Sequence, residues 1–176
     1  MTAAEIVELL QLQLPGAVGG SQIDAVDPSV RIKAEQLHAV CRFLRDEPSL
    51  RFDMLNLISA IDYFQPDPKL SDKVSWQPHL QLLYHLSSFA RRHRIVLRVV
   101  LPRWQGETPG KLPEVSTVSD LWPTANWHER EVYDLCGVRF VGHDDLRRMY
   151  LPEDWVGHPL RKDYQFPAEY HGIPAK

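Results

Sequence analysis

Three stretches of the chain carry apolar residues at helical spacing. In the stretch 33–47 they fall at i, i+3, i+4 and i+7, and a proline follows. The stretch 5–13 also has one apolar face and ends before a proline–glycine pair. The stretch 124–136 is the most charged, and Gly137 follows it where a left-handed helix cap belongs. The pattern predicts three helices.

Other stretches show the pattern of strands. In residues 80–87, four apolar side chains alternate with Gln81, Leu83, His85 and Ser87, which predicts a strand buried mainly on one face. The apolar run 95–101 follows closely enough to form an antiparallel hairpin with it.

Three further stretches carry weaker signals. A strand is expected around 23–32, and the continuous apolar run 52–64 fits a short helical turn leading into a buried strand, although periodicity does not decide between helix and strand there. Ser116 or Ser119 is expected to cap a short helix that reaches Trp122, with Pro123 opening the next helix.

Regular periodicity disappears from Gly142 onward. We therefore expect an α+β fold, with a two-layer core domain over residues 1–141 in which a mixed or antiparallel sheet packs against helices. Residues 142–176 would form an extended, irregular C-terminal arm.

Composition and charge exclude several classes of function. The 176 residues include 20 lysines and arginines and 23 aspartates and glutamates, for a formal net charge of −3. This balance offers no basic excess to attract nucleic acid or an anionic membrane surface. No apolar run is long enough for a transmembrane helix, and the N-terminus lacks a secretion signal. We expect a cytoplasmic protein without direct membrane insertion.

Few residues suggest cofactor chemistry. Cys41 and Cys136 lie far apart in apolar helical stripes, whereas an iron–sulfur cluster needs about four thiolates, so both are expected to be buried core residues. His143, His158 and His171 lack the spacing of a metal site, which favours surface or hydrogen-bonding roles.

The charged helix 124–136 leaves two interpretations open. Glu129, Glu131 and Asp134 could form an acid/base set, but the nearby Arg130 favours a salt-bridged helix face, with Arg130 and Asp134 as an i, i+4 pair.

The stretch 127–164 interleaves charges, aromatics, prolines and glycines too densely for either a core or a free surface, which suggests a docking surface. Its sequence includes Glu129-Arg130-Glu131-x-x-Asp134-Leu135-x-Gly137-Val138 and, later, Leu151-Pro152-Glu153-Asp154-Trp155-x-Gly157-His158-Pro159-Leu160-Arg161-Lys162-Asp163-Tyr164. These motifs resemble the 30 kDa subunit, also called the C subunit, of the proton-pumping NADH:quinone oxidoreductase, respiratory complex I. Weaker similarity covers most of the chain.

The resemblance implies a non-catalytic subunit that assembles and supports the quinone module, chiefly beside the D and B subunits. It places the chain in the peripheral arm on the cytoplasmic side of the bacterial inner membrane. The complex uses NADH, FMN, iron–sulfur clusters and quinone and couples electron transfer to proton translocation, whereas this chain would bind no cofactor or metal and have no activity alone.

The resemblance also gives the motif residues a structural or interface role. They are Glu129, Arg130, Glu131, Asp134, Gly137, Gly142, His143, Arg147, Arg148, Pro152, Asp154, Trp155, Gly157, Pro159, Leu160, Arg161, Lys162, Asp163 and Tyr164. The alternatives are the J subunit of a ferredoxin-dependent photosynthetic-type NDH complex, a stand-alone acid/base enzyme using Glu129 or Glu131, and a small adaptor outside respiration.

The arm is expected to order mainly on partner subunits, because fixing its backbone costs more free energy than this small domain can offset. In that arrangement Arg147, Arg148, Arg161 and Lys162 would pair with carboxylates of the partners.

Overall fold

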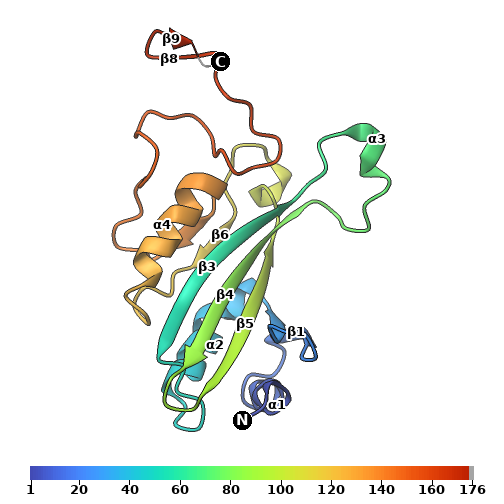
Figure 1. The fold of residues 1–176 in the computed structure, drawn as a ribbon, viewed down its shortest axis with the longest axis vertical. Helices are drawn as coiled ribbons and strands as arrows, with labels where there is room; N and C mark the ends of the chain where they lie inside the picture. The colour runs from blue at the N-terminus through green and yellow to red at the C-terminus, as the bar shows by residue number, and fades with distance from the viewer. Residues whose placement is uncertain (175–176) are drawn as a thin grey trace.

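The structure, a computed structural model, describes residues 1–174. Its main element is a five-stranded mixed sheet in the order β1-β2-β5-β4-β3 (Figure 1). β2 pairs with β5 in parallel, and the other neighbouring strands are antiparallel. The strands are β1 (Val18–Gln22), β2 (Ser29–Ile32), β3 (Met54–Tyr63), β4 (His79–Ser88) and β5 (His93–Leu101).

The β4–β5 hairpin confirms the alternation seen in the sequence. Leu80, Leu82, Tyr84 and Leu86 are buried in the core, and the residues between them are half-buried on the opposite face. The undecided stretch 52–64 contains the ten-residue strand β3, which pairs with β4 along its length. The backbone hydrogen bonds to β4 favour a strand here, and the apolar run by itself did not reveal this partner.

The helices close the core on one side of the sheet. α1 (Ala3–Gln13) begins with a capping box between Thr2 and Glu5, and α2 (Leu37–Asp46) follows a 3₁₀ turn (Ala34–Gln36). α4 (Ala125–Cys136) lies beside β3 (Figure 1). Core side chains come from all these helices and from the inner face of the sheet, as the predicted α+β fold requires.

Three elements differ from the prediction. The expected strand 23–32 is confined to β2, and residues 23–28 form the turn that joins it to β1. The short helix expected before Trp122 is a single turn, in which the amides of Leu121 and Trp122 both donate to the carbonyl of Val118. The Trp122 indole donates to the carbonyl of Phe52 at 3.0 Å, so a tertiary contact holds this turn. α4 then begins at Ala125 rather than at Pro123.

The remaining elements are short. A turn of helix, α3 (Pro68–Ser71), sits in the long β3–β4 connection, which projects away from the sheet (Figure 1). A 3₁₀ turn (Gln105–Glu107) follows β5, and β6 (Glu114–Ser116) pairs in parallel with β7 (Arg139–Val141). β8 (Glu169–Tyr170) and β9 (Ile173–Pro174) form a small hairpin near the end of the chain.

From Gly142 to residue 168 the backbone forms neither helix nor strand, as expected for the irregular arm. Figure 1 shows this segment passing along α4 before it reaches the β8–β9 hairpin. The last two residues of the predicted arm, 175 and 176, lie outside the described residues.

Gly137 joins α4 to the packing of the arm. It adopts the predicted left-handed cap, with φ of 69°, and its amide donates to the carbonyl of Tyr133. A Cβ atom added here would overlap the His158 ring, 2.8 Å from its Cγ atom. The backbone conformation and the approach of the arm both require glycine at this position.

We predict that Gly137→Ala lowers the free energy of unfolding by about 2–4 kcal/mol, the sum of left-handed strain and overpacking. Gly110→Ala is the matched control, because Gly110 also has a positive φ but nothing lies within 4 Å of its added Cβ. The control should lose only about 1–2 kcal/mol. Urea unfolding of both variants would measure the difference, and equal losses would contradict the packing of His158 on Gly137.

Candidate functional site

The Asp134 cluster, defined as Asp134, Arg148 and the amides of residues 149–151, anchors the arm to α4. The Asp134 side chain is 0% exposed. One carboxylate oxygen accepts the amides of Met149, Tyr150 and Leu151 at 2.9, 2.7 and 3.0 Å. The other accepts from Nη1 of Arg148 at 2.7 Å. A single side chain of α4 is thus surrounded by donors from one continuous stretch of the arm.

These donors keep the buried carboxyl ionised. Burial alone would raise the pKa of Asp134, but the Leu151 amide, the Arg148 guanidinium and the amides of Met149 and Tyr150 together hold the pKa below its ordinary value. A buried carboxylate with these partners is stable only while the arm follows this path.

Arg148 extends the cluster further along the arm. Its Nη2 donates to the carbonyls of Trp155 and Gly157, both at 3.0 Å. The Nδ1 atom of His158 lies 2.9 Å from the carbonyl oxygen of Asp134. These contacts hold residues 148–158 in a loop against the C-terminal half of α4.

A second set of contacts, the Arg103 cluster of Asp62, Arg103, Arg161 and Asp163, fixes the next part of the arm to the sheet. Arg103 donates to both oxygens of Asp62 at 2.8 and 2.9 Å and to both oxygens of Asp163 at 3.1 and 2.7 Å. The side chains of Arg103 and Asp62 are 9% and 2% exposed. The Lys162 amide also donates to Asp62, so one buried carboxylate joins β3 to the arm.

Arg161 is buried against backbone carbonyls and an aromatic ring. It donates to the carbonyls of Cys136, Gly137 and Arg103 at 2.8, 3.0 and 2.7 Å, and its guanidinium lies 4.0 Å from the centre of the Trp104 ring. Burial and the nearby Arg103 lower the pKa of Arg161 from its usual value. Because the carbonyls include those at the end of α4, Arg161 also closes that helix end.

These contacts correct two sequence predictions. The expected pair between Arg130 and Asp134 is wrong, because Asp134 binds Arg148 while Arg130 lies 3.7 Å from Asp145 and 4.9 Å from the Trp127 ring centre. The expected pairing of Arg148 and Arg161 with carboxylates on a neighbouring subunit is also wrong. Both guanidinium groups are satisfied within this chain, since a buried charge must be hydrogen-bonded where it is buried.

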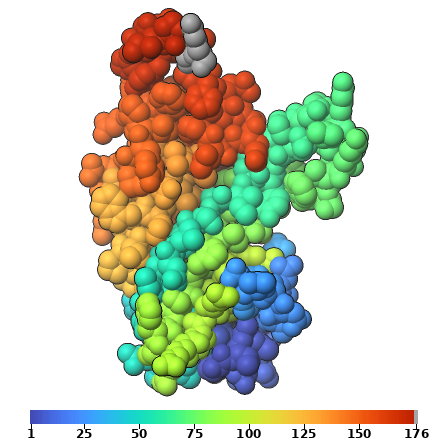
Figure 2. All heavy atoms as spheres, viewed as in Figure 1, coloured from blue at the N-terminus to red at the C-terminus, as the bar shows by residue number. Residues whose placement is uncertain are grey.

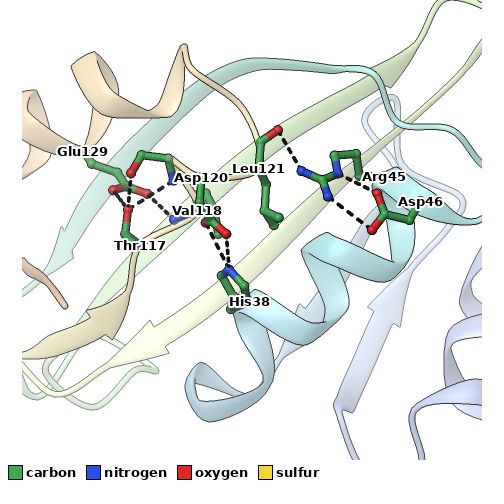
Figure 3. A network of polar contacts seen from close by, with 9 residues as sticks. His38, Arg45, Asp46, Thr117, Val118, Asp120, Leu121 and Glu129 are labelled. Atoms are coloured by element: carbon green, nitrogen blue, oxygen red, sulfur yellow. Dashed lines mark hydrogen bonds and ion pairs between the residues drawn. The ribbon is translucent and has the colours of Figure 1, made fainter. Parts of the chain in front are cut away.

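Glu129 belongs to a separate network on the inner side of α4 (Figure 3). Its carboxyl accepts from the Thr117 hydroxyl and, at 2.8 Å, from the Val118 amide. Burial raises the pKa of Glu129 to about 7, although both hydrogen bonds oppose the shift. Figure 3 also shows the nearby His38–Asp120 pair, joined at 3.0 Å, which links α2 to the same turn.

The acidic residues of α4 therefore have separate surroundings. Glu129 is fully buried, Asp134 is occupied by the arm, and Glu131 is partly exposed without a hydrogen bond to any residue of 1–174. The structure does not bring them together around one cavity, which removes the geometry that the acid/base interpretation needs. The salt-bridged helix face is not observed either, because the ion pairs of Asp134 and Arg130 run to Arg148 and Asp145 on the arm. Cys41 and Cys136 are buried, as predicted.

The remaining motif residues lie on the arm or at its start. His143 contacts the carbonyl of Asn126, and Asp154 binds Tyr170 and His171. Trp155 packs on Tyr170, 5.0 Å between ring centres, and Tyr164 packs on Phe166. The side chain of Arg147 is 66% exposed and pairs with Asp145, two residues before it. Gly142, Pro152 and Lys162 are exposed, and Pro159 is half-buried.

The anchored arm leaves large apolar side chains in solvent. Val156 is 85% exposed, Tyr150 61% and Leu160 58%, although the Leu160 amide donates to the carbonyl of Leu135 at 2.9 Å. Phe166 is also exposed. A fixed backbone that presents exposed apolar side chains is typical of a protein interaction surface.

Sequence reasoning missed Thr117, Asp62 and Arg103 as partners in these networks. Asp62 and Arg103 are 41 residues apart and lie near the ends of different strands. The spacing of these two residues in the sequence does not predict that they pair. The burial of both charged side chains would have indicated it, and that burial is known only from the fold.

Two observations on the described residues bear on cofactors and membranes. No group of three or more histidine, cysteine or acidic side chains in 1–174 is arranged to hold a metal ion. No helix in the same range is long and apolar enough to cross a membrane.

The sequence matches one family model over residues 30–170, described as the respiratory-chain NADH dehydrogenase, 30 Kd subunit. The chain is 41% identical to the C subunit of the NADH-quinone oxidoreductase from Roseiflexus castenholzii, over 93% of this chain and 84% of the relative. It is 40% identical to the corresponding C subunit from Geotalea uraniireducens, over 77% of this chain and 71% of the relative.

The fold is similar to a chain in the structure of the membrane-bound sulfane sulfur reductase, an archaeal respiratory membrane complex. The TM-score is 0.68 at 23% identity, over 94% of this chain and 86% of that chain. At this identity the likeness concerns the fold alone.

We predict that Glu129 makes stability depend on pH. Because its folded-state pKa of about 7 lies above the ordinary value of 4.5, the stabilisation is complete below pH 4.5 and is lost as pH rises towards and through 7. The loss should total about 3 kcal/mol and level off above neutral pH.

Glu129→Gln should remove this decline, since the amide oxygen can accept from Val118 and the amide nitrogen can donate to Thr117 without any ionisation. Glu131→Gln, on the same helix, should keep the wild-type pH dependence. Urea unfolding between about pH 4 and pH 8 checks both variants across the window between the two pKa values. A decline that persists in Glu129→Gln would contradict the assignment.

Proposed function

Because the chain belongs to the respiratory-chain NADH dehydrogenase 30 kDa subunit family, we propose that it acts as the structural C subunit of a proton-translocating NADH:quinone oxidoreductase. The complex passes electrons from NADH through FMN and iron–sulfur clusters to quinone. In this proposal the chain performs no chemistry itself and holds neighbouring subunits of the quinone module in position.

The thiol chemistry of the chain supports the absence of a resident cluster. Cys41 and Cys136 are the only cysteines, and each is buried. Burial raises the pKa of both thiols, that of Cys136 to about 11, so neither favours the thiolate form that binds iron. FMN, the clusters and the quinone site would belong to other subunits.

The observation that carries the proposal is the anchored arm with its exposed apolar side chains. The Asp134 and Arg103 clusters fix the backbone, while Tyr150, Val156 and Leu160 remain exposed. Such a preorganised surface lowers the entropy cost of binding. We propose that residues 1–141 are the core domain and that 142–176 contact the D and B subunits on the cytoplasmic side of the membrane.

The alternatives receive less support. The relatives are named as C subunits, which favours that role over the J subunit of a ferredoxin-dependent complex. A stand-alone acid/base enzyme would need Glu129 or Glu131 to act on a substrate. Glu129 is fully buried against Thr117 and Val118, and Glu131 has no hydrogen-bond partner among residues 1–174 that would position it for catalysis. No residue pattern favours the adaptor role outside respiration.

We predict that Leu160→Gln lowers the amount of the chain found in the assembled complex by about tenfold, because it replaces an apolar contact with an amide that must be desolvated. Leu12→Gln is the control: Leu12 is 71% exposed on α1, at the opposite end of the molecule from the arm (Figure 1). Native electrophoresis of membranes from cells carrying each variant measures incorporation.

The isolated variants should both melt within a few degrees of wild type, since neither leucine is buried. Equal incorporation of the two variants would contradict docking through the arm. Absence of the wild-type chain from the complex would contradict the proposed function itself.

A further inference from the structure

No helix among residues 1–174 covers one face of the main sheet. In Figure 1 β3, β4 and β5 lie in front of α2, and Figure 2 shows these strands reaching the surface on that side. We call it the open sheet face. The side chains that define it are Arg31, Leu57, Ile61, Leu83, Arg98 and Val100, which alternate along their strands with core residues.

Aliphatic residues make much of this face apolar. Leu57 and Ile61 are 39% and 38% exposed on β3, and Leu83 and Val100 are half-buried on β4 and β5. A cavity of about 210 Å³ opens on the same side, with Leu57, His85 and Val96 in its lining. It has room for an apolar side chain from another molecule.

The charge on this face is unbalanced. Arg31 on β2 stands directly opposite Arg98 on β5 in the parallel register. Neither arginine side chain forms a hydrogen bond or an ion pair with any residue of 1–174, and the Nε atom of Arg98 is shielded from solvent without an acceptor. Like charges placed side by side across a sheet destabilise the free chain.

Carboxylates near these arginines are few. Asp27 lies 3.5 Å from Arg94 rather than near the pair, and Glu35 lines a hollow beside Arg31 without pairing with it. Two adjacent guanidinium groups that lack a carboxylate partner can bind a carboxylate from another molecule, because the fork geometry of arginine suits carboxylate oxygens.

We propose that the open sheet face is a second docking surface, occupied by a segment of another polypeptide of the complex that carries acidic and aliphatic side chains. Its carboxylates bind Arg31 and Arg98, and an aliphatic side chain enters the cavity near Val96. This proposal rests on the proposed function, since it assigns the partner to the same complex. The mixture of aliphatic side chains with only a few arginines fits a protein partner better than a lipid surface, which needs a denser basic cluster.

The test uses Arg31→Glu, which removes the carboxylate site and places opposite charges across the β2–β5 register. The isolated variant should melt at or above the wild-type temperature. Its incorporation into the complex should nevertheless fall at least about tenfold at physiological ionic strength. If the variant is as stable as wild type and still fails to assemble, unfolding cannot be the cause of the failure.

Arg42→Glu is the matched control, with the same change of charge at an exposed site on α2, behind the sheet. It should incorporate like wild type. Incorporation of Arg31→Glu at the level of Arg42→Glu overturns the proposal. Absence of the wild-type chain from the complex instead overturns the proposed function.

Photo-crosslinking provides a readout that does not depend on the stability of a charge variant. A photoreactive amino acid replaces Gln81, on β4 between Ile61 and Val100, in the chain assembled into its complex. We expect crosslinks to an acidic segment of another subunit. Crosslinks only to lipid or to a second copy of this chain, or no crosslinks at all, would overturn the proposal.

Discussion

The position of the C-terminal part of the molecule depends on one buried carboxylate. Asp134 is fully shielded from solvent, and a carboxylate left unpaired there would cost about 3–5 kcal/mol, a large share of the stability of a small domain. Three consecutive amides, from Met149 to Leu151, and the Arg148 guanidinium satisfy it. The irregular path of the arm follows from this requirement rather than from any local preference for helix or strand.

In the Arg103 cluster, further along the chain, buried charges are again satisfied by hydrogen bonds. Asp62 receives Arg103 and the Lys162 amide, and Arg161 closes the carbonyl end of α4. With the backbone held at both clusters, the apolar side chains of Tyr150, Val156 and Leu160 remain exposed to solvent. The open sheet face is also unpartnered, since its arginines have no acceptor among residues 1–174, in contrast to Arg103 and Arg148. Both surfaces agree with a chain whose role is to bind neighbouring subunits.

The sequence predicted the elements whose apolar residues recur at short, regular spacing or whose ends carry a characteristic residue. Leu80, Leu82, Tyr84 and Leu86 indicated one buried face of β4, and Gly137 indicated the end of α4 through its left-handed conformation. The sequence did not show whether the run 52–64 forms a helix or a strand, because a buried helix and a strand paired with a long neighbour can be equally apolar. It paired Asp134 with Arg130 by helical spacing, whereas burial selected Arg148, which comes with three adjacent amides. The family resemblance did not reveal these pairings, because a motif names residues without their partners.

Hydrogen exchange at the amides of Met149, Tyr150 and Leu151 in the isolated chain tests the central claim most directly. If Asp134 orders the arm within this domain, the three amides exchange slowly in wild type and fast in Asp134→Leu, which has a similar shape but no acceptor for them, while the β4 amides stay protected in both. Exchange of the three wild-type amides at the rate of an unfolded chain, with β4 still protected, would contradict the account. The arm would then acquire its order only from its partners.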